Sequence, residues 1–124
     1  MRVFKNRIFQ RWAEKEGLDD VRLRMAVAEI ERGLIDAELG GHVIKKRVAI
    51  NGKGKRSGYR TLIAYRSGDK AFFVYGFAKN ELANVSADEL KALRLLAKEL
   101  LGYSDGSLAV ALRQGILFEV DGDE

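Results

Sequence analysis

Apolar residues near the start of the chain recur every three or four positions, which is the spacing of one face of a helix. The pattern predicts a helix over residues 6–16, which Gly17 should end. Its apolar face is formed by Phe9, Trp12 and Ala13. A second helix follows after a tight turn, so residues 1–38 are expected to form a helical hairpin.

The second helix is predicted to begin after an N-cap at Asp19 and to run to about Arg32, with Gly33 closing it. The residues expected to face inward are Val21, Val27 and Ile30, together with either Met25 or Leu23. The spacing does not decide between Met25 and Leu23.

The middle of the chain changes to short apolar runs rich in β-branched and aromatic residues, which are typical of strands. Strands are predicted over residues 43–50, 59–65 and 70–77, and a hairpin turn at 67–69 joins the last two. The third run is almost wholly apolar, which favours a central position in the sheet. Residues 43–77 are therefore expected to form a three-stranded core.

The clearest local signal lies at Ser86 and Glu89, which form a capping box ahead of a helix predicted to end at residue 101. The inner positions of this helix are Leu90, Leu93, Ala97 and Leu100. A short helix near 105–113 and a last strand, 116–120, follow. Helices before and after a run of strands predict an α+β fold in which helices pack on a small, mostly antiparallel sheet. The chain is expected to form a single domain, 1–124. Its parts are the helical hairpin (1–38), the three-stranded core (43–77), a helix (86–101), and the last helix and strand (105–120).

The 124 residues carry a net charge of +4 and no cysteine. The charge favours a polyanionic partner only if the cations cluster, and the absence of cysteine excludes disulfides and thiolate metal sites. The N-terminus lacks the apolar segment of a signal peptide, and no apolar run is long enough for a membrane helix. A cytoplasmic protein without a membrane role is expected. The single histidine, His42, is interpreted as a turn residue, and no metal site is predicted.

The cations do cluster between the first two predicted strands. Residues 52–60 contain three glycines and four cationic side chains, which are Lys53, Lys55, Arg56 and Arg60. This is not a P-loop, because Arg56 follows the Gly-Lys pair and a strand follows the loop. A solvated loop and a nucleic-acid contact explain the segment equally well when it is considered alone.

Cations on the flanking strands favour the nucleic-acid interpretation. Arg47 and Arg60 would extend the positive field onto the sheet if they share a face, and Lys79 follows the third strand. Tyr59 and Tyr75 offer rings for base stacking, although tyrosines on strands are more often packing residues.

Several runs together resemble the RelE/HigB-type toxins of bacterial type II toxin–antitoxin modules, in the branch with a longer N-terminal helical hairpin. The resemblance extends from Phe4 to Val120. It rests on Met25 to Ala37, Lys46 to Ala49, Gly52 to Thr61, Phe72 to Glu81 and Asn84 to Leu90. The chain departs from that branch at Arg56 and Ser57, where small residues and a pair of glycines are usual.

The resemblance implies a ribosome-dependent endoribonuclease that cleaves mRNA and halts translation, together with a small antitoxin, commonly a helix-turn-helix protein, as partner in a hetero-oligomer. Cleavage would use the 2′-hydroxyl against the adjacent phosphate without a metal or another cofactor. Arg60 would stabilise the phosphorane, because a guanidinium binds two phosphate oxygens at once. Lys79 would be a second stabiliser or proton donor, and Tyr75 a further catalytic candidate. The RNA-binding candidates are Arg47, Lys53, Lys55, Arg56 and Tyr59.

Two other classes of function fit the same residues. A nucleic-acid- or ribosome-binding module would need the cations but no catalytic geometry. A protein-binding scaffold would use an exposed strand to pair with its partner.

Overall fold

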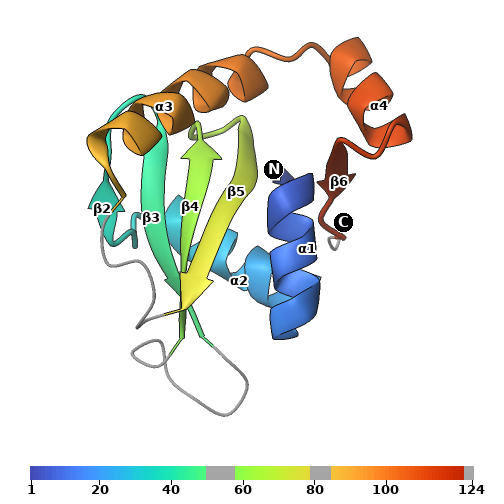
Figure 1. Cartoon of the computed structure of the whole chain (residues 1–124). Helices are drawn as coiled ribbons and strands as arrows, with labels where there is room; N and C mark the ends of the chain where they lie inside the picture. The colour runs from blue at the N-terminus through green and yellow to red at the C-terminus, as the bar shows by residue number, and fades with distance from the viewer. Residues whose placement is uncertain (50–57, 79–84, 122–124) are drawn as a thin grey trace.

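The computed structural model describes residues 1–49, 58–78 and 85–121. Within these residues the chain forms six strands and four helices, arranged as an α+β fold with one mostly antiparallel sheet (Figure 1). The elements are β1 (Arg2–Asn6), α1 (Arg7–Glu16), α2 (Asp20–Glu31), β2 (Ala37–Glu38), β3 (Val43–Val48), β4 (Tyr59–Tyr65), β5 (Lys70–Ala78), α3 (Ala87–Leu101), α4 (Asp105–Arg113) and β6 (Leu117–Glu119).

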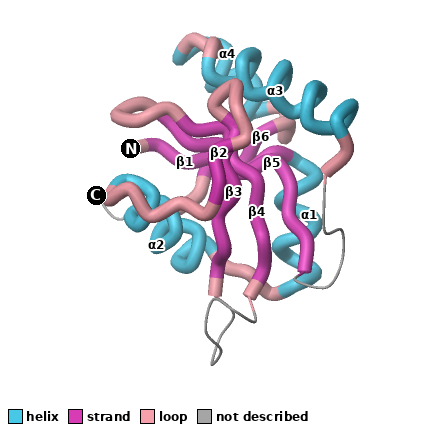
Figure 2. Tube along the Cα trace, turned by 90° about the vertical axis from the view of Figure 1, so that its left-hand side faces the viewer, coloured by secondary structure: helices cyan, strands magenta, loops and turns pink. Residues whose placement is uncertain are grey.

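The strands lie in the order β2-β3-β4-β5-β1-β6, and only β1 and β5 run parallel. Helices α1 and α2 cover one face of the sheet, whereas α3 and α4 cover the other (Figures 1 and 2). Each face therefore has its own apolar cluster. β5 lies between β4 and β1, so the prediction that this apolar strand is central is confirmed.

The first two helices begin and end at the residues that the sequence singles out. The Asn6 side chain accepts a hydrogen bond from the Phe9 amide, and Gly17 ends α1 with a φ of 73°, a value that suits glycine. Asp19 caps α2 by accepting from the Arg22 amide. The capping box at Ser86 and Glu89 is likewise confirmed at the start of α3.

The phase of α2 differs from part of the prediction. Leu23, Val27 and Ile30 are buried together with Ala26. Val21, expected to face inward, is 66% exposed, and Met25 is 57% exposed. The stretch 21–30 carries apolar residues on two sides of the helix, so the sequence pattern alone did not define the face that packs on the sheet.

Strand β1 was not predicted, because it is short and passes directly into α1. It is nevertheless an internal strand whose residues Val3, Phe4 and Lys5 are buried. The Lys5 ammonium lies 2.7 Å from a carboxylate oxygen of Asp20, which compensates the charge in this setting. β2 has only two residues and is too short for a sequence pattern. β3 ends at Val48, two residues before the predicted end.

The burial of α2 predicts a contrast between Leu23 and Met25. Leu23→Ala should lower the free energy of unfolding by about 2–5 kcal/mol, because it leaves a cavity under α2. Met25→Ala should change it by less than about 0.5 kcal/mol, since the side chain is largely in solvent. Urea denaturation of both variants provides the measurement. Equal losses would show that the phase of α2 is wrong.

Candidate nucleic-acid interface

The pairing of the central strands brings Arg47 and Arg60 together. These two residues are directly opposite in the antiparallel β3–β4 pair, and Arg60 is in turn opposite Phe77 on β5. Directly opposite residues project to the same face of a sheet, with Cβ atoms about 4.5–5.5 Å apart. The sequence-based condition that the two arginines share a face is therefore met.

A second row of side chains lies beside the first on the same face. Leu62 on β4 is opposite Lys45 on one side and Tyr75 on the other. We call the five side chains Lys45, Arg47, Arg60, Tyr75 and Phe77 the candidate face. The Tyr75 and Phe77 ring centroids are 6.1 Å apart, so the aromatic part of this surface adjoins its cationic part.

Arg47 is held in place by one carboxylate. The Arg47 Nε lies 2.8 Å from Asp36 Oδ1, and the Arg47 backbone N–H donates to the other oxygen of the same group at 2.6 Å. The Arg47 side chain remains 42% exposed, and its terminal nitrogens donate to no described residue. Asp36 thus orients the guanidinium while leaving its outer edge available to an anion.

Arg60 is restrained by its own strand. Its Nη1 donates to the Gly58 carbonyl oxygen at 3.1 Å, and no carboxylate within the described ranges forms a salt bridge with it. Like charges placed directly opposite each other destabilise a sheet. An anion between Arg47 and Arg60 would remove that repulsion.

Tyr75 lines a mainly apolar groove of about 240 Å³ between β5 and the first turns of α3. The other lining residues are Val85, Glu89, Ala92, Leu93 and Leu96. Hydrogen bonds from the Ser86 backbone N–H and from its side chain lower the pKa of the Glu89 carboxyl below its usual value. The groove next to Tyr75 therefore has one ionised carboxylate at its edge at neutral pH.

Tyr59 projects to the opposite face and does not join the candidate face. It is buried against α1, where its hydroxyl donates to Glu16 Oε1 at 2.8 Å and its ring meets Trp12 edge-on. This geometry corresponds to the packing role that is common for tyrosines on strands.

The remaining predicted site residues, Lys53, Lys55, Arg56 and Lys79, lie outside the described residues. Lys45 was not singled out from the sequence, although the two-residue period of a strand places it on the same side as Arg47. Lys46 between them is buried and faces α2, where its ammonium pairs with the partly exposed Glu29 carboxylate. Because successive side chains of a strand project to opposite faces, residues 45 and 47 share one face and residue 46 lies on the other. This alternation is the sequence signal that distinguishes Lys45 from Lys46.

Other kinds of site are not found in the part of the chain that the structure describes. It contains no cluster of three or more His, Cys, Asp or Glu side chains that could hold a metal ion. His42 occupies a turn with a φ of 67°, as its interpretation as a turn residue requires. Among the described helices, none has the length and apolar character needed to span a membrane.

Comparison with known families identifies the kind of protein to which this interface belongs. A family model described as the RelE toxin of the RelE/RelB toxin–antitoxin system matches residues 1–120. The chain belongs to the RelE toxin family. No curated protein matches it. This RelE-family chain is accordingly the toxin component of a toxin–antitoxin system and has an antitoxin as its partner. Its assignment to the branch with the longer hairpin stays a prediction.

Two tyrosines of this RelE-family toxin allow a matched test of the geometry. Tyr59→Phe should lower the free energy of unfolding by about 1–3 kcal/mol, because it removes a partly buried hydrogen bond to a carboxylate. Tyr75→Phe should leave it unchanged, since the Tyr75 hydroxyl donates to no described residue. Urea denaturation compares the two variants. If Tyr75→Phe costs as much as Tyr59→Phe, the two faces have been assigned incorrectly.

Proposed function

We propose that this RelE-family toxin is an endoribonuclease that cleaves mRNA on the ribosome in the cytoplasm and thereby inhibits translation. The observation that carries the proposal is the placement of Arg47 directly opposite Arg60, on a partly exposed face that also presents Lys45 and Tyr75. Adjacent guanidinium groups suit a phosphodiester, whose oxygens accept several charge-assisted hydrogen bonds.

The proposed reaction needs no metal. The 2′-oxygen of one nucleotide attacks the adjacent phosphorus, the bond from phosphorus to the 5′-oxygen breaks, and a 2′,3′-cyclic phosphate forms. One proton leaves the 2′-hydroxyl and one is delivered to the 5′-oxygen. Catalysis then requires stabilisation of the phosphorane charge and two positioned proton-transfer groups.

Arg60 is the proposed phosphorane stabiliser, since it lies between Arg47 and the aromatic pair Tyr75 and Phe77. Tyr75 would contribute a phenol or a stacking ring, and Lys79 a second positive charge or the proton for the leaving oxygen. Arg47 would hold the RNA backbone together with the loop cations, which are Lys53, Lys55 and Arg56. Tyr59 is left out of this arrangement, because it is buried on the other face.

Arg60→Ala should lower single-turnover mRNA cleavage on programmed ribosomes by about 10²–10³-fold, the usual cost of one lost transition-state donor. Arg60→Lys should recover only part of the rate, because an ammonium lacks the two-pronged geometry. Arg66→Ala is the matched control, because Arg66 follows the other end of β4 and is paired with Asp69. Undiminished cleavage by Arg60→Ala would show that the active-site assignment is wrong.

The same assay separates the enzyme from its alternatives. Cleavage of free RNA at the same rate without ribosomes would point to another class of nuclease. Ribosome binding and growth arrest without any cleavage product would favour a non-enzymatic binding module. Complex formation with the antitoxin alone, without RNA affinity, would favour a protein-binding scaffold.

Lys79→Ala should reduce growth inhibition on induction, and the charge-conserving Lys79→Arg separates two roles for the side chain. An arginine restores a positive charge, but its pKa is too high to donate a proton at neutral pH. If Lys79 acts as a stabiliser, Lys79→Arg should keep most of the cleavage rate. If it is the proton donor, Lys79→Arg should be as impaired as Lys79→Ala. Full toxicity of both variants would exclude Lys79 from the mechanism.

The antitoxin is proposed to be a small helix-turn-helix protein that forms a hetero-oligomer with the toxin. The support is the family, whose description pairs the toxin with a second protein. Co-expression with the product of the neighbouring gene, followed by measurement of the mass of the complex, tests this part independently of cleavage.

A further inference from the structure

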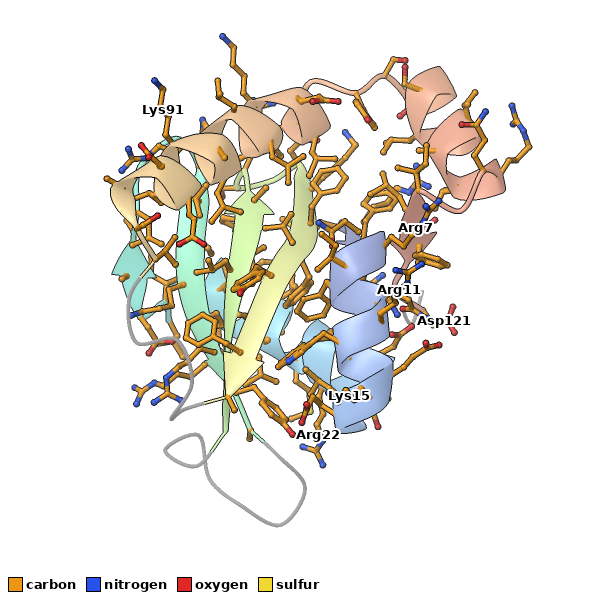
Figure 3. The ribbon with its side chains drawn as sticks, viewed as in Figure 1. Arg7, Arg11, Lys15, Arg22, Lys91 and Asp121 are labelled. Atoms are coloured by element: carbon orange, nitrogen blue, oxygen red, sulfur yellow. The ribbon has the colours of Figure 1, made fainter. Side chains whose placement is uncertain are left out.

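The outer side of α1 presents three cationic side chains in a line. Arg7, Arg11 and Lys15 occur at intervals of four residues and are all exposed. Figure 3 shows Arg7 and Arg11 on the side of α1 away from the sheet and Lys15 near the other end of the helix. We call these three residues the α1 stripe. The helical rise spaces successive members by about 6 Å along the axis.

This arrangement is unfavourable for the isolated helix. Like charges four residues apart destabilise a helix by a few tenths of a kcal/mol per pair, about 0.2–0.5 kcal/mol. No described carboxylate forms a salt bridge with any of the three. The two acidic residues of the helix have other partners, since Glu14 accepts a hydrogen bond from Gln10 and Glu16 accepts one from Tyr59. Arg7 donates to the Gly115 carbonyl oxygen.

Some of the cations elsewhere on the described surface are paired with carboxylates, whereas others, such as Arg60, form no salt bridge with a described residue. Salt bridges join Arg2 to Glu119, Arg47 to Asp36 and Arg66 to Asp69. The α1 stripe differs in that it gathers three cations on one helix, none of which forms a salt bridge with a described residue. It is also remote from the candidate face, because α1 packs on the opposite side of the sheet.

The composition of the stripe favours a nucleic acid over a protein partner. The centres of protein interfaces are apolar and depleted in lysine, whereas the stripe is formed by cations. Its exposed apolar neighbours are Ile8 and Ile116, which follows the Gly115 carbonyl that Arg7 contacts. Insertion into a membrane surface would need an available apolar helix face, and that face of α1 is buried through Phe9 and Ala13. Evenly spaced cations along a rod suit the regular charges of a phosphate backbone.

We propose that the α1 stripe is a second RNA-docking surface, which binds the phosphate backbone of a structured RNA and not the strand that is cleaved. The proposal rests on the proposed function, in which the structured RNA is that of the ribosome. Its role is to position the toxin, so it acts on affinity and not on the chemical step.

The test measures binding of the toxin to purified ribosomes over a range of salt concentrations. All variants carry Arg60→Ala and the ribosomes carry no mRNA, so that cleavage does not perturb the equilibrium whatever the role of Arg60. Arg11→Gln with Lys15→Gln should weaken binding and lower the slope of log affinity against log salt by roughly 1.4–1.8, the value for two lost phosphate contacts. The loss of affinity between 50 and 200 mM salt should then be about tenfold smaller than for the parent.

The matched control is Lys91→Gln with Lys98→Gln, which removes the same charge from the exposed side of α3. Lys91 lies far from the α1 stripe in Figure 3. This control should keep the parental slope, as should the charge-conserving pair Arg11→Lys with Lys15→Arg. Thermal melts should show that all three double variants remain folded, because the changed side chains are exposed.

A parental slope in the Arg11 and Lys15 double glutamine variant would overturn the proposal, and so would an equal loss in the Lys91 and Lys98 control. Retained ribosome binding with lost antitoxin binding would assign the stripe to the protein partner instead. If Arg60→Ala leaves cleavage intact but the slopes differ as expected, the active-site assignment fails and the docking surface stands.

Discussion

The buried Lys46 is the residue on which the arrangement of the sheet most depends. Its side chain is only 4% exposed, and its ammonium lies 2.8 Å from a Glu29 oxygen and 2.7 Å from the Leu34 carbonyl oxygen. A buried charge without its partner costs about 3–5 kcal/mol. A slip of β3 by one residue would turn Lys46 away from α2 and send Arg47 into the core. The ion pair therefore fixes both the register of β3 and the position of α2.

The register fixed in this way determines which cations face outward. Lys45 and Arg47 project to the side opposite Lys46, and the pairing with β4 then places Arg60 beside Arg47. Asp36 restrains Arg47 without covering its outer edge. Asp36 compensates the charge of Arg47 but not that of Arg60, so an anion bound on this face would reduce the repulsion between the two arginines. The family supplies the biological setting, and the proposed cleavage gives the anion an identity.

Local rules recovered much of this fold from the sequence. The caps at Asp19 and Ser86, the glycine that ends α1, and the three central strands depend on neighbouring residues, which a sequence displays directly. The missed features depend on tertiary contacts. β1 is recognisable only through its pairing with β5 and β6, and the phase of α2 depends on which of its two apolar sides meets the sheet.

In the candidate site, too, some features could be predicted from neighbouring residues and others depend on tertiary contacts. The sequence pointed to Arg47 and Arg60, because they flank a basic segment, and their shared face follows from the register of β3 and β4. The sequence also suggested an RNA contact for Tyr59, whose ring could stack on a base. Strand alternation and the hydrogen bond to Glu16 instead place it on the α1 side. Adjacency in the sequence is a poor guide to function within a strand, because successive side chains project to opposite faces.

The two cationic surfaces are connected by a close contact between α1 and β5. A Cβ atom added at Gly76 would lie 2.3 Å from a ring carbon of Trp12, so only glycine lets the indole approach the strand this closely. Trp12 also contacts Phe9 and Tyr59, which anchors its ring on several sides. Since close-packed interiors are stiff, α1 has little freedom to turn against the sheet. An RNA held by the α1 stripe would therefore fix the orientation of Arg60 on the other face, although neither surface touches the other.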